Sequence, residues 1–295
     1  MPATQSVGLI GIGLMGQAFA ERLVAAGIAV VGYDIDPART ARLAALGGQP
    51  VASIAEAAQR CEAILLAVFS TDQVEQVVEE EILPAVGESS GKVVMCASTC
   101  DPDRIAALGA RVAKRGLAFL ETPVSGTSEQ VRRGQGVGLI GGDAAIAAKV
   151  AQVLGALFQS QFHVGRIGDG GRAKLAINLI LGLNRLALAE GLVFAERLGL
   201  DPGAFLPIAR ASAASSQVMD TKGPKMLARD FAPEGRVRQT LKDARLMLDQ
   251  ARRVGQRLPL LEVHADVLEA CVRAGDGDRD NSIVIAEIAR RRQEK

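Results

Sequence analysis

Short apolar runs alternate with Ala-rich amphipathic segments over about the first 165 residues, and this alternation constrains the fold more than any other feature. Several runs are apolar nearly throughout, which is typical of parallel strands covered by helices on both faces. Strands separated by helical segments predict βαβ units. We expect strands at Val7–Ile10, Ala29–Tyr33, Ala63–Val68, Lys92–Cys96, Leu117–Leu120, Val137–Ile140 and Gln161–Val164.

The pattern changes at a cluster of four glycines: Gly165, Gly168, Gly170 and Gly171. Beyond it, residues 173–199 predict one long helix, and Asp201 followed by Pro202 is typical of an N-cap with proline at the first helical position. At about 150 residues per domain, a chain of 295 residues accommodates two domains. We therefore expect an α/β domain over residues 1–165 and an all-helical domain over residues 166–295.

Composition argues against several classes of function. Lys and Arg number 34 against 33 Asp and Glu, so a net charge of +1 provides no general attraction to nucleic acid or to an anionic membrane. Two distant histidines and four cysteines without a C-x-x-C pair predict no metal site. Reduced thiols and an N-terminus without a basic leader region predict a cytoplasmic protein. The most apolar stretch, Leu175–Ala195, carries Asn, Arg and Glu side chains that are costly in hydrocarbon, so we expect no membrane span.

Three glycines, Gly11, Gly13 and Gly16, have the spacing G-x-G-x-x-G. With 32 glycines in the chain, chance alone produces this spacing about 0.4 times, so the context decides. The motif ends the first expected strand and precedes a helix expected at Gln17–Ala26, where free N–H groups and the helix dipole favour a pyrophosphate. We predict that the loop binds a dinucleotide through Gly11, Ile12, Gly13, Leu14, Met15 and Gly16.

Asp34 ends the second expected strand, 18 residues after Gly16. A carboxylate there accepts hydrogen bonds from a ribose 2′-OH and repels a 2′-phosphate, which favours NAD over NADP. Arg39 is near enough in the sequence to accept a phosphate, so NADP stays possible. The alternative explanation of Asp34 is an acidic helix cap ahead of Asp36 and Pro37.

Lys174 and Asn178 follow the glycine cluster and share one helix face if the helix begins near Gly171. The glycines allow backbone to approach a ligand without a Cβ clash, and burial beside a cofactor lowers a lysine pKa toward a value suited to acid–base catalysis. A surface lysine at an ordinary helix start explains the same residues.

A polar stretch, Thr122–Ser128, directly follows the expected strand Leu117–Leu120. Loops at the carboxyl ends of strands hold ligands in sheets of this kind, so the hydroxyl and N–H groups of Ser125–Ser128 predict a site for a small carboxylate. Alternatively, these side chains cap their own backbone in a turn.

Together these stretches resemble the β-hydroxyacid dehydrogenases, the group similar to 3-hydroxyisobutyrate dehydrogenase and 6-phosphogluconate dehydrogenase. The chain is similar to the family at its N-terminal signature (Leu9–Gly16), its substrate-binding motif (Pro123–Gly126), its G-x-x-G-x-G-x-x-x-K-x-x-x-N catalytic motif (Gly165–Asn178), its late Lys-Asp pair (Lys242-Asp243) and its C-terminal acidic segment (Asp280–Ser282). The resemblance covers essentially the whole chain. It implies an α/β fold, with an N-terminal Rossmann dinucleotide-binding domain followed by an all-helical C-terminal domain and joined to it by a long interdomain helix.

The resemblance also implies an activity, namely hydride transfer between NAD or NADP and a small β-hydroxyacid or the matching semialdehyde. In this family-based interpretation, Lys174 is the general acid/base and Asn178 orients the substrate hydroxyl. The substrate carboxylate is held by Ser125, Gly126 and Thr127. The cofactor is lined by Val68, Phe69, Ser98, Thr99 and Lys242.

Thr127 departs from the family, which usually has glycine at this position, so its side chain either contacts the substrate or narrows the pocket. Two alternatives share the fold: an imine reductase, which generally lacks the lysine, and a non-catalytic NAD(P)-binding regulatory protein. Lys174 and Asn178 argue against both. A homodimer or homotetramer is expected, because the family's substrate domain exposes apolar helical surface.

Overall fold

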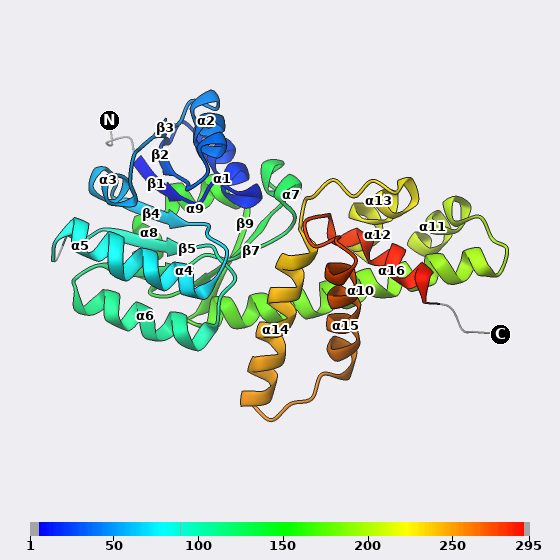
Figure 1. Cartoon of the computed structure of the whole chain (residues 1–295). Coiled ribbons are helices and arrows are strands. Elements are labelled where there is room, and N and C mark those ends of the chain that lie inside the picture. Colours follow the sequence, from blue (N-terminus) through cyan, green and yellow to red (C-terminus); the bar gives the residue numbers. More distant parts are fainter. Residues whose placement is uncertain (1–5, 89, 292–295) are drawn as a thin grey trace. The chain divides into compact units, whose positions relative to one another are not determined.

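The structure is a computed structural model that describes residues 6–88 and 90–291. The first five residues, on which the expectation of no leader partly depends, lie outside the described residues. The chain forms two compact units, Met1–Lys174 and Leu175–Lys295. One helix, α10 (Asp169–Arg197), belongs to both, since it begins in the first unit and ends in the second (Figure 1).

The N-terminal unit is built on a single sheet, nine-stranded over the described residues, in the order β3-β2-β1-β4-β5-β6-β8-β7 with β9 paired to β8. All neighbours from β3 to β6 are parallel, and the order 3-2-1-4-5-6 is that of the Rossmann fold. At the other edge, β8 runs antiparallel to β6 and β7, so the expectation of a parallel sheet is wrong there. The strands are β1 (Ser6–Ile10), β2 (Ala29–Tyr33), β3 (Gln49–Pro50), β4 (Ala63–Leu66), β5 (Val93–Cys96), β6 (Ala118–Glu121), β7 (Val124–Ser125), β8 (Val137–Gly141) and β9 (Ser160–Gly165).

Helices cover both faces of this sheet (Figure 1). In β4, Ala63 and Leu65 pack into the core that contains α1 and α9, whereas Ile64 and Leu66 pack into the core that contains α3 and α6. This two-sided burial is why the strand sequences are apolar throughout. The helices of this unit are α1 (Leu14–Ala25), α2 (Pro37–Ala45), α3 (Ile54–Arg60), α4 (Thr71–Gln76), the π-helical η1 (Val77–Ile82), α5 (Leu83–Val86), α6 (Pro102–Lys114), α7 (Ser128–Arg132), α8 (Ala144–Lys149) and α9 (Ala151–Leu157).

The strands β1, β4, β5 and β6 end at the same level. Ile10 pairs with Leu66, Leu66 with Cys96, and Cys96 with Glu121. The loops that follow these strands therefore leave the sheet at one edge. Between β1 and β4 the strand order reverses, which is the place where such sheets bind ligands.

The C-terminal unit is helical and has its own core, to which Leu192, Leu241 and Leu268 belong. Its helices, after the shared α10, are α11 (Pro202–Ala211), α12 (Gln217–Thr221), α13 (Gly223–Ala228), α14 (Val237–Arg253), α15 (Pro259–Arg273), the 3-10 helix η2 (Asn281–Ile283) and α16 (Val284–Arg290). The expected fold class, a Rossmann domain joined by a long helix to a helical domain, is confirmed.

By length and composition alone, α10 is long and apolar enough to cross a membrane, because an 18-residue window within it has a mean hydropathy of 1.5. A third of that apolar window is buried within the protein. Among the described residues no second helix meets this test. The absence of a membrane span stays a prediction.

Candidate active site

The glycine loop between β1 and α1 is a tight backbone turn. Gly11 has φ +90°, and a Cβ there would lie 2.7 Å from the carbonyl oxygen of Ala67. At Gly16 a Cβ would lie 2.0 Å from the carbonyl oxygen of Gly11, so neither position accepts a side chain. Gly13 differs, because the nearest atom to a Cβ there would be a guanidinium nitrogen of Arg39, at 4.0 Å. The turn is closed at Gly11 and Gly16 and open at Gly13.

The start of α1 suits an anion. The helix begins at Leu14, three residues earlier than expected, with Gly13 as an N-cap that offers no side-chain hydrogen bond and with no acidic residue in the first turn. Uncapped N–H groups, the positive end of the helix dipole and the open space at Gly13 fit a pyrophosphate. Leu14, Met15 and Gly16 lie in this first turn, whereas the N–H of Ile12 donates to Asp34.

Asp34 fastens the glycine loop to the end of β2. Its Oδ2 accepts a hydrogen bond of 2.6 Å from the N–H of Ile12, and its Oδ1 accepts one of 2.9 Å from the N–H of Asp36. The guanidinium of Arg39 lies 3.3 Å from Oδ2. Asp36 is the N-cap of α2, because its carboxylate accepts from the N–H of Ala38. The alternative interpretation of Asp34 as the helix cap is therefore wrong.

Two further loops meet at the same sheet edge, one after β4 and one after β5. The Ser98 hydroxyl donates a 2.7 Å hydrogen bond to the carbonyl oxygen of Val68 and so ties the loops together. Phe69 is exposed, and its N–H donates to Oε1 of Gln73. Thr99 is half-buried beside Ser98. Val68, Phe69 and Thr99 thus lie at the edge where the glycine loop also emerges.

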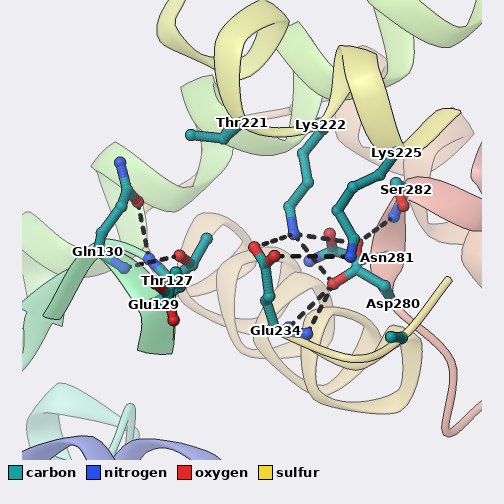
Figure 2. A network of polar contacts seen from close by, with 12 residues as sticks. Thr127, Glu129, Gln130, Thr221, Lys222, Lys225, Glu234, Asp280, Asn281 and Ser282 are labelled. Atoms are coloured by element: carbon teal, nitrogen blue, oxygen red, sulfur yellow. Dashed lines mark hydrogen bonds and ion pairs between the residues drawn. The ribbon is translucent and has the colours of Figure 1, made fainter. Parts of the chain in front are cut away.

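Thr127 caps the short helix α7. Its hydroxyl accepts from the N–H of Gln130 at 3.2 Å, and Oε1 of Gln130 accepts from the N–H of Thr127 at 2.9 Å (Figure 2). This capping box satisfies both groups within the loop. The alternative interpretation of self-capping side chains is correct for Thr127, while Ser125 and Gly126 are half-buried just before it.

The helix that carries Lys174 begins at Asp169, two residues before the expected start. Glu121, the last residue of β6, reaches this helix start: Oε2 accepts from the N–H of Gly168, and Oε1 accepts from the N–H of Gly171 at 3.1 Å. Burial raises the pKa of the Glu121 carboxyl to about 7, against the opposite effect of the glycine N–H groups. Glu121 was not predicted from the sequence, because its partners lie about 50 residues further along the chain.

Lys174 is only 7% exposed, three residues beyond Gly171. Lysine is among the residues that are least often buried, so an ordinary surface lysine at a helix start does not describe it. Asn178 follows one turn later on the same helix.

Within the helical unit, Asp243 links two of the predicted site residues. Nδ2 of Asn178 donates to Oδ2 of Asp243 at 3.1 Å, and Nζ of Lys242 lies 3.0 Å from Oδ1 of the same carboxylate. Asp243 is buried in α14 and joins this helix to α10. The sequence offered only its adjacency to Lys242, so this bridging role was missed.

The C-terminal acidic segment forms a separate buried network. Nζ of Lys222 lies 2.9 Å and 3.0 Å from the two oxygens of Asp280, which also accept from the N–H groups of Glu234 and Ser282 (Figure 2). Burial raises the pKa of the Asp280 carboxyl, but Lys222 and the N–H donors outweigh it and hold the pKa below its usual value. Asp280 joins α13 to the loops before α14 and α16.

A 3-2-1-4-5-6 parallel sheet, an uncapped glycine loop at its reversal point and an acidic residue at the end of β2 define a dinucleotide-binding protein. Comparison with known families agrees. Residues 6–165 match the NAD-binding domain of 6-phosphogluconate dehydrogenase, and residues 168–288 match the NAD-binding region of NADP-dependent 3-hydroxyisobutyrate dehydrogenase. The chain belongs to this dehydrogenase family, and the resemblance inferred from the sequence is confirmed.

Individual relatives match over almost their full length. L-threonate dehydrogenase of Cupriavidus necator is 32% identical over 96% of this chain and 95% of its own. A crystal structure of 3-hydroxyisobutyrate dehydrogenase from Salmonella typhimurium superposes with a TM-score of 0.88 and 26% identity, covering 96% of this chain and 99% of that one. The Mycobacterium tuberculosis 3-hydroxyisobutyrate dehydrogenase with L-serine gives 0.84 and 25%, over 96% and 98%. The chain is an NAD(P)-dependent oxidoreductase that acts on hydroxyacids or their carbonyl counterparts.

Proposed function

We propose that this protein transfers a hydride between NAD(P) and a short β-hydroxyacid or its semialdehyde, with Lys174 as the general acid/base. The observation that carries the proposal is the burial of Lys174 on α10, one turn before Asn178. Burial of the Lys174 amine costs solvation free energy, and a role in proton transfer explains why the amine is buried. The bound nicotinamide supplies the hydride acceptor or donor at C4.

In the oxidation direction, neutral Nζ of Lys174 takes the hydroxyl proton while the carbinol carbon loses its hydride. In reduction, protonated Nζ gives that proton to the carbonyl oxygen. Asn178 orients the hydroxyl, because Asp243 fixes its amide through Nδ2 and leaves the amide oxygen available as an acceptor. Ser125, Gly126 and Thr127 hold the carboxylate, and the capping box with Gln130 fixes Thr127 in this loop.

The cofactor residues of the proposal are those of the sheet edge: the glycine loop, Asp34, Val68, Phe69 and Thr99, with Lys242 from α14. Asp34 supports NAD as the preferred coenzyme, because its charge is held at the end of β2 by two backbone N–H groups. The names of relatives, among them L-threonate dehydrogenase and 2-hydroxy-3-oxopropionate reductase, support a short acid as the substrate.

The test is a screen of NAD- and NADP-dependent turnover at 340 nm against 3-hydroxyisobutyrate, serine, glycerate, threonate and matching semialdehydes. Lys174→Ala should lower kcat by about 10²- to 10⁴-fold, because it removes the group that moves the proton. The Kd for NADH, followed by fluorescence, should stay nearly constant. Lys149→Ala, at an exposed lysine of α8, is the matched control and should leave kcat unchanged.

Each other outcome has a definite meaning. Equal loss of NADH binding in Lys174→Ala would show that the lysine serves the cofactor and not the proton transfer. Binding of NADH with no turnover on any acid would favour the non-catalytic regulatory protein. Turnover of cyclic imines but no acid would favour an imine reductase.

We further propose that the protein is a cytoplasmic homodimer or homotetramer. The four buried cysteines carry free thiols, as suits a reducing compartment. The helical unit exposes large apolar side chains on α10, on α11 and in the turn between them, which supports association through this unit: Ile180, Phe194, Leu198 and Ile208.

A further inference from the structure

We propose that Glu121 is a positioning residue, which fixes the first turn of α10, and with it Lys174, against the strand that leads into the substrate loop. The proposal rests on the proposed function, because it gives Glu121 a part in the reaction through Lys174. All groups concerned lie within the unit Met1–Lys174.

The contact joins two segments that carry different parts of the reaction. Glu121 ends β6, and the chain continues from it through Thr122 to the loop at Ser125. Its two carboxylate oxygens accept from Gly168 and Gly171, so they satisfy N–H groups that the first turn of a helix leaves without intrahelical partners. One side chain therefore links the origin of the substrate loop to the turn that precedes Lys174.

The glycines around this carboxylate are shaped to receive it. A Cβ would lie 2.8 Å from Oε2 of Glu121 at Gly141 and 2.9 Å from Oε1 at Gly171. At Gly170 it would lie 3.1 Å from Cβ of Glu121. Gly170 and Gly171, which the sequence predicted would let backbone approach a ligand, thus make room for a side chain of the protein itself. Gly141, Gly170 and Gly171, which we call the glycine cradle, hold the carboxylate in one place. The carboxylate in turn holds the start of α10.

The charged neighbours of Glu121 do not explain its presence as a stabilising ion pair. Arg172 on α10 favours the carboxylate, but this guanidinium is already paired with Asp103 and Asp169. On β5, the thiol of Cys96 has a pKa well above its usual value, first because of its hydrogen bond with Cys100, so it stays neutral. Lys174 follows on the same helix. Burial raises the pKa of Glu121 to about 7, so the carboxyl changes its protonation state near neutral pH.

Two variants disturb the contact in different ways. In Glu121→Gln the amide turns an N–H group toward one of the two glycine donors, and in Gly171→Ala the new methyl group displaces Oε1 without changing charge. We expect each to lower kcat by about 10- to 100-fold, as for a misplacement of about 1 Å, and to leave the Kd for NADH within about twofold. Asp143→Asn, at the N-cap of α8, and Gly155→Ala, where a Cβ would meet nothing within 4 Å, are matched controls that should keep full activity.

The pH profile separates positioning from a general loss of structure. In the reduction direction Lys174 gives a proton to the substrate, so its role by itself predicts no loss of kcat at low pH. We expect the wild type also to lose kcat below about pH 7, where Glu121 takes up a proton, and Glu121→Gln to lack this acid limb. An unchanged acid limb together with wild-type kcat in Glu121→Gln would overturn the proposal. An equal loss of NADH binding in Glu121→Gln and Gly171→Ala would overturn it as well.

Hydrogen exchange provides a readout that does not need a substrate. Amides of residues 168–174 should exchange faster in Glu121→Gln and Gly171→Ala than in wild type, and Gly155→Ala should match wild type there. Unchanged exchange in both cradle variants would refute the positioning role even if no substrate is found. If exchange is faster in the two variants but the wild type turns over none of the acids, the proposed function is refuted. The inference that Glu121 fixes the start of α10 is then still supported.

Discussion

At the scale of residues, the bonding of Asp34 decides what it can discriminate. Two backbone N–H groups hold its carboxylate at the end of β2, and Arg39 stands 3.3 Å away. The fixed negative charge of Asp34 repels a 2′-phosphate. When that carboxylate is removed, the guanidinium of Arg39 attracts the phosphate. We predict that Asp34→Ala raises the ratio of kcat/KM with NADP to kcat/KM with NAD by about 10-fold or more, measured by initial rates at saturating substrate.

Asp34→Asn distinguishes charge from loop anchoring, because its amide oxygen still accepts from the N–H of Ile12. It should shift the coenzyme ratio in the same direction with a smaller loss of total activity. Equal losses with both coenzymes in the two variants would mean that Asp34 only anchors the glycine loop.

The residues predicted from the sequence are those that form a motif over a short stretch of chain. The glycine loop depends on local spacing, and the structure explains Gly11 and Gly16 by backbone contacts within that turn and with Ala67. Glu121 and Asp243 carried no such signal, because a strand-end carboxylate acquires its meaning only when a helix start or an amide from elsewhere in the chain reaches it.

At the scale of elements, the start of α10 is where stability and pH are coupled. The pKa of Glu121 is about 7 in the folded protein against 4.5 ordinarily, so the folded state binds more protons between these values. The contribution of Glu121 to stability is therefore greatest at low pH and is lost as the pH rises from about 4.5 to about 7, by about 3 kcal/mol. The stability of Glu121→Gln relative to wild type should increase over this range.

Urea unfolding at a series of pH values and one protein concentration measures this difference. Asp143→Asn should follow the wild-type dependence, because this exposed cap has no comparable burial. A wild type and a Glu121→Gln variant whose unfolding midpoints change in parallel with pH would show that the carboxyl titrates near its ordinary value.

The boundaries of elements show what a local pattern can predict. The parallel strands β1, β2, β4, β5 and β6 were expected within two residues, since burial on both faces leaves a continuous apolar run. The two-residue strands β3 and β7 carry no such run and were missed. The reversal of β8 was not predictable either, because strand direction depends on how the chain connects and not on strand composition.

At the scale of the whole molecule, the predicted association depends on what covers the apolar side chains of the helical unit. Phe194 on α10 and Leu198 just after the end of this helix are each 64% exposed, and Ile208 on α11 is 65% exposed. Full burial of such a side chain contributes about 1.5–3 kcal/mol. In a symmetric dimer each of these side chains is buried once on each subunit. We predict a solution mass of at least twice 30.8 kDa by light scattering.

Phe194→Glu should shift this mass toward that of a single chain, because association would then bury a carboxylate without a partner. Lys149→Glu changes an exposed charge on α8, outside the helical unit, and should leave the mass unchanged. A wild type of 30.8 kDa in solution would refute the association itself. An oligomer unaffected by Phe194→Glu would refute only the assignment of this face, and the interface would then have to lie on other surfaces of the protein.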